Sequence, residues 1–434
     1  PPTLLPPTRE IRARIEKEAV IGVKDPCIRR KYLDLIAKYH QAISADSYDF
    51  GRFRFAKHLI KLKSDEPVFQ KQYPIPHAHR KAITAHMEKL LHAGVISPCK
   101  DSAFNTPFFV ILKKDGASLR VLQDLRRLNQ QSVDDRYIFN DIQSCIDEIG
   151  RAGSKIFNVL DVCSGYYHLE LADESKPKTA FTLPNGMILR RKDGSLVSGR
   201  FQFDLLSLGL HGSGASFSKM MNYVIRGIEQ LIAYMDDCLQ HGSSHEQVLE
   251  TLEIILQRFV RYNIKYSLKK ARFGMSTVQF LGHEFGPHGV KPAADNVKAL
   301  IDIPPPRTVP QVKSFCGVAN FFRQYVPSYA AVASHLTRLT KKSSSWRGGA
   351  LPPEALRAFH KLKTAIATSP VLHFPRFDRD FEVHTDAAAG SSGGEPGGLG
   401  CVLIQRDEEG HPHPVCFASR SLKQHELNYS ASAL

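Results

Sequence analysis

Residues 231–239 decide how this chain folds, and they read Leu231-Ile-Ala-Tyr-Met-Asp-Asp-Cys-Leu239. The adjacent aspartates Asp236 and Asp237 stand between two apolar runs, a pattern that predicts a tight turn between two strands. Two neighbouring carboxylates concentrate negative charge, which is costly unless a divalent cation neutralises it. Because an Asp-Asp pair alone more often belongs to a solvated turn, the rest of the chain has to decide between these interpretations.

A third carboxylate ends another predicted strand. The run Lys155-Ile-Phe-Asn-Val-Leu160 is strand-like and is followed directly by Asp161. Two such strands side by side would bring Asp161, Asp236 and Asp237 together as an oxygen-rich site for Mg²⁺. Two ions ~3.5–4 Å apart can activate a 3′-hydroxyl and stabilise a departing pyrophosphate in an in-line displacement.

Length and charge narrow the class of protein. The 434 residues predict two to four domains at ~100–200 residues each. A net charge of +15 favours a polyanionic partner, most often nucleic acid, with a basic soluble enzyme as the alternative. The hydrophobic fraction of 42% excludes a disordered tail. No apolar run approaches the ~18 residues of a membrane span, and no signal segment supports secretion.

The cysteines and the chain ends add two expectations. The eight cysteines are scattered without a Cys-x-x-Cys pair, which argues against a zinc ribbon or a disulfide scaffold and for a reducing compartment. The chain starts at Pro1 rather than Met and stops at Leu434 inside an amphipathic segment, so we expect a piece of a longer protein.

The periodicity predicts both helices and strands along the chain. Helices are predicted near residues 8–20 and 30–43, and from Val248 to Phe259. Hairpins are predicted from Phe104 to Leu122, with a basic tip, and over residues 185–200. A proline-rich boundary follows at 303–306. The last predicted elements are strands at 381–385, 399–405 and 414–418, with a flexible glycine-rich insertion at 390–400.

The aspartates belong to motifs that occur in a recognisable order. Tyr234-Met-Asp-Asp237 resembles the signature box of reverse transcriptases, and Leu160-Asp-Val-Cys-Ser-Gly-Tyr-Tyr-His-Leu-Glu-Leu171 resembles their first catalytic motif. Phe315-Cys-Gly-Val-Ala-Asn-Phe-Phe-Arg323 resembles the connecting region of gypsy-like LTR retrotransposon Pol polyproteins, and Thr385-Asp-Ala387 resembles the start of their ribonuclease H domain. With the blocks at 113–129, 209–222, 280–292 and 419–430, the resemblance covers roughly residues 66–434.

The resemblance implies a right-hand polymerase of fingers, palm and thumb, in the α+β class, followed by a connection and a truncated ribonuclease H-like α/β domain start. Residues 1–65 would be an N-terminal linker or protease-to-polymerase segment, 66–245 the fingers and palm, and 246–302 the palm end and thumb. Residues 303–374 would be the connection, and 375–434 the N-terminal part of the ribonuclease H-like domain.

The resemblance also implies a metal site. Asp161, Asp236 and Asp237 would hold two Mg²⁺ ions, with Mn²⁺ as a substitute and Asp237 as the more peripheral ligand. Asp386 would be the first catalytic acid of the ribonuclease H domain. The next glutamate of the family would fall just past Leu434, so we expect no RNA hydrolysis by this chain.

Substrate contacts follow from the same resemblance. Lys113 and Arg120 would grip the incoming triphosphate. Tyr166 would exclude a 2′-hydroxyl and so select dNTPs, with a half-buried core tyrosine as the alternative. Gly209 would let the backbone approach the template–primer. For the basic, aromatic-interleaved residues 258–272, contact with phosphates and a solvated helix end both stay open.

The implied partners are an RNA or DNA template with its primer, dNTPs and other Pol segments such as the protease and integrase, without a membrane. The implied location is a cytoplasmic virus-like particle with access to the nucleus.

Two blocks depart from the family pattern. Residues 207–218 lack the usual prolines and gain Gly214, which should loosen the entry to a supporting helix, and residues 188–200 look like an insertion. The leading function is therefore RNA-directed DNA polymerase, and the alternative is a decayed or domesticated copy that binds nucleic acid without polymerising. A serine hydrolase at Ser213 is disfavoured because His211 occupies the place of the first glycine of Gly-x-Ser-x-Gly.

Overall fold

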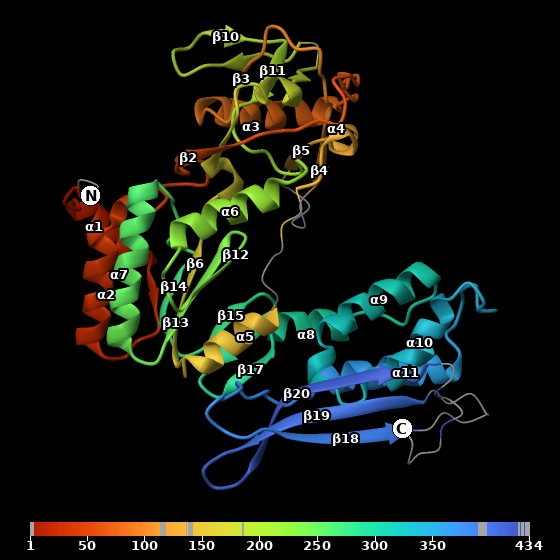
Figure 1. Ribbon diagram of the computed structural model, residues 1–434. Coiled ribbons are helices and arrows are strands. Elements are labelled where there is room, and N and C mark those ends of the chain that lie inside the picture. Colours follow the sequence, from red (N-terminus) through yellow and green to blue (C-terminus); the bar gives the residue numbers. More distant parts are fainter. Residues whose placement is uncertain are drawn as a thin grey trace. The chain divides into compact units, whose positions relative to one another are not determined.

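The computed structural model describes residues 4–112, 119–135, 137, 142–184, 186–388, 397–423, 426 and 429, with backbone alone at Leu112, Leu119 and Arg120. The chain divides into two compact units. The first comprises Pro1–Asn140, Asn158–Gln240 and His245–Met275, and the second comprises Asp141–Phe157, His241–Ser244 and Ser276–Leu434. Each unit is described by itself, with the element labels of Figure 1.

A five-stranded sheet with the order β1-β14-β6-β13-β12 forms the centre of the first unit. Its strands are β1 (Val20–Ile21), β14 (Arg272–Met275), β6 (Ile156–Asp161), β13 (Asp237–Gly242) and β12 (Leu231–Tyr234). Four apolar residues of the two central strands are fully buried, namely Phe157 and Leu160 of β6 and Cys238 and Leu239 of β13. Such apolar runs are typical of a strand that is covered on both faces of its sheet. The two strands that the sequence predicts to lie side by side are neighbours.

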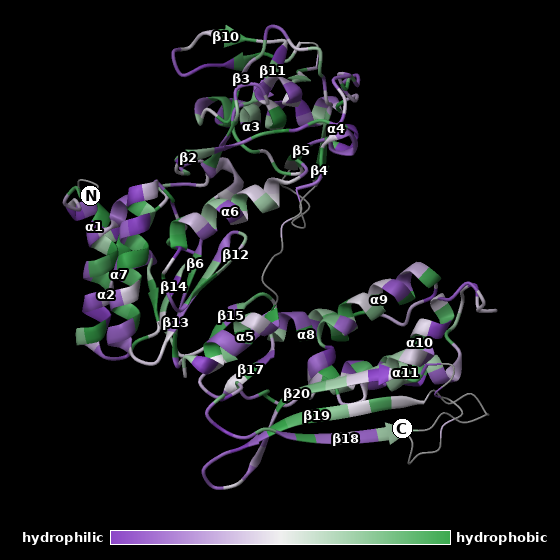
Figure 2. Ribbon diagram, in the orientation of Figure 1, coloured by the Kyte–Doolittle hydropathy of each residue, from purple (hydrophilic) through white to green (hydrophobic). Residues whose placement is uncertain are grey.

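Helix α7 (His245–Tyr262) confirms the helix predicted from Val248 to Phe259. Its buried residues recur every three or four positions, and they are Val248, Leu252, Ile255, Leu256 and Phe259. Figure 2 shows hydrophobic and hydrophilic residues alternating along this helix. The buried stripe faces the interior, where α7 packs with α2 (Pro26–Lys38) and α6 (Ser213–Ile225).

The N-terminal residues are part of the first unit. Thr8 caps α1 (Arg9–Glu18), and Asp25 caps α2 by accepting hydrogen bonds from two backbone N–H groups. Val20 and Ile21 form β1, which extends the central sheet by pairing in parallel with β14. Strand β2 (Phe53–His58) then pairs in parallel with β7 (Leu169–Leu171).

The remaining elements of the first unit include the predicted hairpins. Strands β4 (Phe108–Leu112) and β5 (Leu119–Gln123) pair antiparallel, as do β9 (Leu189–Arg190) and β10 (Leu196–Val197), so both predicted hairpins are confirmed. The tip at 113–118 lies outside the described residues. The other elements are α3 (Arg80–His92), α4 (Arg126–Gln131) and a sheet of β3 (Ile96–Pro98), β11 (Arg200–Phe203) and β8 (Phe181–Thr182).

The second unit contains two three-stranded antiparallel sheets, five α-helices and two short 3₁₀ helices among its described residues. One sheet has β15 (Val278–Phe280), β16 (His283–Gly286) and β17 (Gly289–Pro292), and the other has β18 (Glu382–Ala388), β19 (Gly398–Arg406) and β20 (Pro412–Ser421). The last three are the predicted C-terminal strands. The helices are α5 (Ile142–Arg151), α8 (Ala294–Ile301), α9 (Val309–Phe321), α10 (Tyr329–Thr337) and α11 (Pro353–Ala367). None of the described helices in either unit has the length and apolarity needed to cross a membrane.

Candidate active site

Two strand ends of the central sheet carry the predicted carboxylates. Asp161 is the last residue of β6, and Tyr234 pairs with Asp237 across the β12–β13 turn. Met235 and Asp236 are the two residues of that turn, and Met235 adopts a φ of +50°. A bulky residue in the left-handed region stores about 1 kcal/mol or more of strain, which persists only where the surroundings enforce the conformation. The tight turn predicted from residues 231–239 is therefore confirmed.

Backbone hydrogen bonds hold these strand ends to their neighbours. The Val162 N–H donates to the Asp236 carbonyl oxygen at 2.8 Å, which joins β6 directly to the turn. The Ser267 N–H donates to the Asp161 carbonyl oxygen at 2.9 Å, which joins β6 to the segment after α7. The positions of both aspartates are thus set by main-chain contacts between segments distant in sequence.

The site strongly disfavours additional negative charge. Burial, together with the charges of Asp161 and Asp237, raises the pKa of Asp236 to about 6, and the positive charge of Lys270 opposes this shift. Burial, followed by the charge of Asp161, also raises the pKa of Asp237. Carboxylates that raise one another's pKa in this way are stabilised in the ionised form by a cation.

One such cation is supplied by the chain itself. The Lys270 ammonium lies 3.1 Å from each carboxylate oxygen of Asp161, and the Lys270 side chain is 66% exposed. The sequence placed Lys270 inside the ambiguous basic run 258–272 without a role of its own. The run of positive residues was the available signal, but nothing in it distinguished Lys270 from Lys269, which instead lies 3.8 Å from Glu18.

The donor set fits a divalent cation. Oδ1 of Asp236 is buried and has no hydrogen-bond partner among the described residues, so it is free to act as a ligand. Asp161, Asp236 and Asp237 do not bring three ligand atoms within 4.8 Å of one another. The described residues contain one group of three or more ligand atoms within 4.8 Å of one another, in the second unit, and it consists of the half-buried Asp407 and the exposed Glu409 and His411.

A wall of small and aromatic groups faces Asp236. Gly165 lies in a short 3₁₀ helix, Gly165–His168, and a Cβ atom at this position would lie 2.3 Å from Asp236 Oδ1 and 2.8 Å from Phe217 Cζ. Only glycine fits there. The Tyr166 ring packs against Phe217 at a centroid distance of 5.5 Å, and burial raises the pKa of Tyr166. Sequence reasoning assigned no role to Gly165 or Phe217, because their importance depends on a contact across the fold.

The other predicted site residues are placed as follows. Lys113 lies outside the described residues, and Arg120 lies in β5 opposite Ile111, with its backbone alone described. Gly209 has a φ of +89°, and its carbonyl oxygen accepts a 2.8 Å hydrogen bond from Asn129 Nδ2. Asp386 belongs to the second unit, is exposed, and pairs with Gly400 across β18 and β19.

Comparisons with known proteins agree with the geometry. Residues 111–285 match the family "Reverse transcriptase (RNA-dependent DNA polymerase)", and residues 351–434 match the "RNase H-like domain found in reverse transcriptase". The chain is 30% identical over 381 residues to the Retrovirus-related Pol polyprotein from transposon 297 of Drosophila melanogaster, a match that covers 86% of this chain and 33% of the relative. It is 28% identical to the Pol polyprotein from transposon gypsy of the same organism, over 93% of this chain and 38% of the relative.

Solved structures show the same fold. The foamy viral protease-reverse transcriptase dRH in complex with ds DNA has a TM-score of 0.82 at 20% identity, and the match covers 100% of this chain and 72% of that chain. The foamy viral protease-reverse transcriptase in complex with RNA/DNA hybrid has a TM-score of 0.78 at 19% identity, over 100% and 55% of the two chains. The predicted α+β polymerase fold is therefore confirmed.

The present chain spans about a third of the length of its Pol polyprotein relatives. Its motifs, its two family matches and these relatives lead to one conclusion: the chain carries a reverse transcriptase domain and an RNase H-like domain, and it is homologous to the gypsy-type retrotransposon Pol polyproteins.

Proposed function

We propose that this chain is an RNA-directed DNA polymerase that adds dNTPs to a primer 3′-hydroxyl on an RNA or DNA template by a two-metal mechanism. The observation that carries the proposal is the unpartnered, buried Oδ1 of Asp236 beside two further carboxylates at adjacent strand ends. A structural ion-pair site would pair that oxygen, whereas a polymerase keeps it free for a metal ion.

Asp161, Asp236 and Asp237 would hold the divalent ions. Bound there, such ions activate the primer hydroxyl and neutralise the charge that develops on the leaving pyrophosphate. The Tyr166 ring, held by Phe217, would lie under the sugar of the incoming nucleotide and exclude a 2′-hydroxyl. Lys113 and Arg120 would contact the triphosphate, and Gly209 the template–primer.

The domain boundaries belong to the same proposal. Fingers and palm would span residues 66–245, the palm end and thumb 246–302, the connection 303–374 and the ribonuclease H-like part 375–434. A foamy viral relative in complex with RNA/DNA hybrid supports a template–primer duplex as the partner. Protease and integrase segments of the same Pol polyprotein, in a cytoplasmic virus-like particle, complete the proposed setting.

Primer extension on poly(rA)·oligo(dT) tests the polymerase. We expect extension that requires Mg²⁺, is supported by Mn²⁺, and is lost in Asp236→Ala. Asp173→Ala is the matched control, because Asp173 is an exposed carboxylate that pairs only with Lys57 and Lys176 among the described residues. Extension by the wild-type chain no greater than by Asp236→Ala would exclude the proposal.

One observation favours the alternative of a copy that binds nucleic acid without polymerising. Helix α6, which carries Phe217, begins after Gly212 in a left-handed conformation with φ +76° and has no side-chain cap. An uncapped start costs roughly 1 kcal/mol and loosens the helix behind Tyr166. Tight binding of an RNA·DNA hybrid in a mobility-shift assay, without extension, would support this alternative.

We further propose that the chain does not hydrolyse RNA. Hydrolysis with two metal ions needs a cluster of carboxylates, and the motif at residues 385–387 supplies Asp386 alone. Cleavage of the RNA strand of a hybrid in the presence of Mg²⁺ would contradict this expectation.

A further inference from the structure

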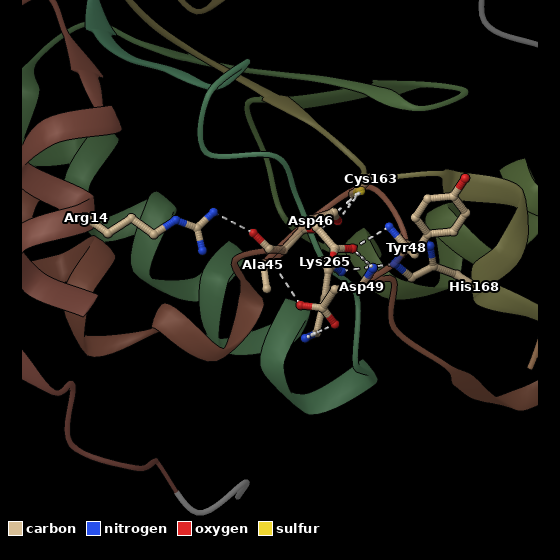
Figure 3. Close-up of polar contacts among 9 residues, drawn as sticks. Arg14, Ala45, Asp46, Tyr48, Asp49, Cys163, His168 and Lys265 are labelled. Carbon is tan, nitrogen blue, oxygen red and sulfur yellow. Dashed lines mark hydrogen bonds and ion pairs between the residues drawn. The ribbon is translucent and has the colours of Figure 1, made fainter. Parts of the chain in front are cut away.

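A loop of the N-terminal segment, residues 44–49, contacts the turn at residues 163–168 that follows Asp161. Figure 3 draws polar contacts among residues of this loop, Cys163, His168 and Lys265. The Ser164 hydroxyl donates to the Ser47 carbonyl oxygen at 3.0 Å, and the Ser44 hydroxyl donates to Cys163 Sγ at 3.3 Å. Ser164 has a φ of +49°, a left-handed conformation that its surroundings must maintain. The loop therefore supports a strained position next to the catalytic strand.

The loop also fixes the carboxylate of Asp49. Oδ1 of Asp46 accepts from the N–H groups of Tyr48 at 2.7 Å and Asp49 at 3.0 Å, which closes the loop. The Ala45 N–H donates to Asp49 Oδ2 at 2.7 Å, and Lys265 Nζ donates to Asp49 Oδ1 at 2.6 Å. Both side chains of the ion pair are mostly buried, at 30% and 21% exposure, so solvent screens it less than a surface pair.

Lys265 joins this ion pair to the turn through its backbone. Its N–H donates to His168 Nε2 at 3.1 Å, and its carbonyl oxygen accepts from the Cys163 N–H at 2.9 Å. Because a backbone N–H can only donate, Nε2 of His168 must be the acceptor nitrogen. The proton then sits on Nδ1, which donates to the Gly165 carbonyl oxygen at 3.1 Å. Burial lowers the pKa of His168 to about 4, in agreement with a neutral ring.

The final contact of this series joins Gly165 to Asp236 of the proposed metal site. Gly165 lies so close to Asp236 that a Cβ atom would come within 2.3 Å of Oδ1. A shift of the turn by a fraction of an ångström would therefore move the wall against which the Asp236 carboxylate rests. The contacts run in an unbroken series from Asp49 through Lys265 and His168 to Gly165.

We propose that Asp49, Lys265 and His168 are positioning residues for the polymerase reaction, and that the N-terminal loop holds the turn at 163–168 in the geometry that Asp236 requires. The catalytic consequence rests on the proposed polymerase function, whereas the mechanical link does not. None of the three residues is a proposed metal ligand or substrate contact, and each acts through Gly165 and Asp236.

Asp49→Asn tests the link in the full-length chain. Asparagine keeps an oxygen for the Ala45 N–H but removes the charge that holds Lys265. The matched control is Lys38→Met, which breaks another ion pair of the N-terminal segment, 2.5 Å from Lys38 Nζ to Glu253 Oε1. This pair joins α2 to α7 and takes no part in the contacts between the loop and the turn at 163–168.

Two measurements separate the outcomes. Hydrogen exchange of the Cys163 amide should accelerate by about tenfold in Asp49→Asn and stay unchanged in Lys38→Met. In primer extension, kcat should fall by about tenfold in Asp49→Asn while KM for dTTP stays within about twofold, because misplaced groups slow the chemical step more than binding. Asp49→Glu should recover most of the lost kcat, and Asp49→Asn/Lys265→Met should lose no more than either single variant.

Equal Cys163 exchange in Asp49→Asn and wild type would overturn the proposal. So would equal kcat losses in Asp49→Asn and Lys38→Met, since that result would indicate a general loss of stability. If the wild-type chain extends no primer, the proposed function fails, yet the exchange measurement still decides whether the loop positions the turn.

Discussion

The ammonium group of Lys270 lies 3.1 Å from both carboxylate oxygens of Asp161, the residue at which β6 ends. The two residues are 109 positions apart in sequence. The pair places a positive charge of the chain itself beside the carboxylates that are proposed to bind Mg²⁺. A metal ion and Lys270 then compete for the oxygens of Asp161.

Replacing Lys270 should strengthen metal binding. In Lys270→Met the competing charge is gone, and we expect Mn²⁺ to bind about two- to fivefold more tightly, because an exposed ammonium contributes on the order of 1 kcal/mol at this distance. Electron paramagnetic resonance of free Mn²⁺ measures the affinity. Lys269→Met is the control, since Lys269 is directed to Glu18 and should leave the affinity unchanged. Equal or weaker binding by Lys270→Met would refute the competition.

Adding one methyl group at Gly165 should abolish activity. The Cβ atom of Gly165→Ala would overlap Asp236 Oδ1 and the Phe217 ring, so we expect a fall in kcat of about 100-fold or more and a loss of about 1–3 kcal/mol in the free energy of unfolding. Gly317→Ala in α9 is the control, because no atom beyond the adjoining residues and the backbone of its own helix lies within 4 Å of the added Cβ. An active Gly165→Ala enzyme would contradict this prediction, because it would show that the turn at 163–168 shifts to accommodate the methyl group.

Removing the buried charge of Asp236 should stabilise the protein while it abolishes polymerisation. Burial and two neighbouring carboxylates oppose ionisation of Asp236, so Asp236→Asn in EDTA at pH 8 should gain about 1–2 kcal/mol in the free energy of unfolding. Thermal unfolding of wild type and variant gives the difference. Asp173→Asn should show no gain, because its carboxylate is exposed and paired with lysines.

Acid should destabilise the first unit through two buried histidines. Burial lowers the pKa of His58 and of His168 to about 4, against an ordinary value of 6.5, so the unfolded chain binds more protons between these pH values. The stability contributed by the neutral rings is fully present above pH 6.5 and is lost as the pH falls toward 4. At pH 5 each ring should cost roughly 2 kcal/mol. Urea unfolding at pH 7.5 and 5 should show this loss, and His58→Gln should reduce it.

Local patterns in the sequence were sufficient for most of the elements. The spacing of Val248, Leu252 and Phe259 predicted α7, and the apolar run before Asp161 predicted β6. These predictions succeed because the period of buried residues is set by the geometry of the helix or strand itself. The turn at Asp236 could also be predicted from local sequence, because the four consecutive residues 234–237 form it.

Other parts of the site were beyond sequence reasoning. Residues 1–65 showed no chemical motif, yet they supply β1 to the central sheet and the loop that contacts the turn at 163–168. Backbone pairing such as that of Val20 with Arg272 uses groups that every residue carries, so no residue pattern reveals it.

The sequence by itself was sufficient to recognise the resemblance to gypsy-type Pol polyproteins, to single out the carboxylates Asp161, Asp236 and Asp237, and to predict the strands that carry them. The tertiary structure alone decided which residues support those carboxylates. Lys270 contacts Asp161, Lys265 contacts His168 across 97 positions, and Gly165 faces Asp236. Such contacts depend on how distant segments pack, because burial and distance, rather than residue type, determine which lysine becomes a counter-ion and which glycine cannot be replaced.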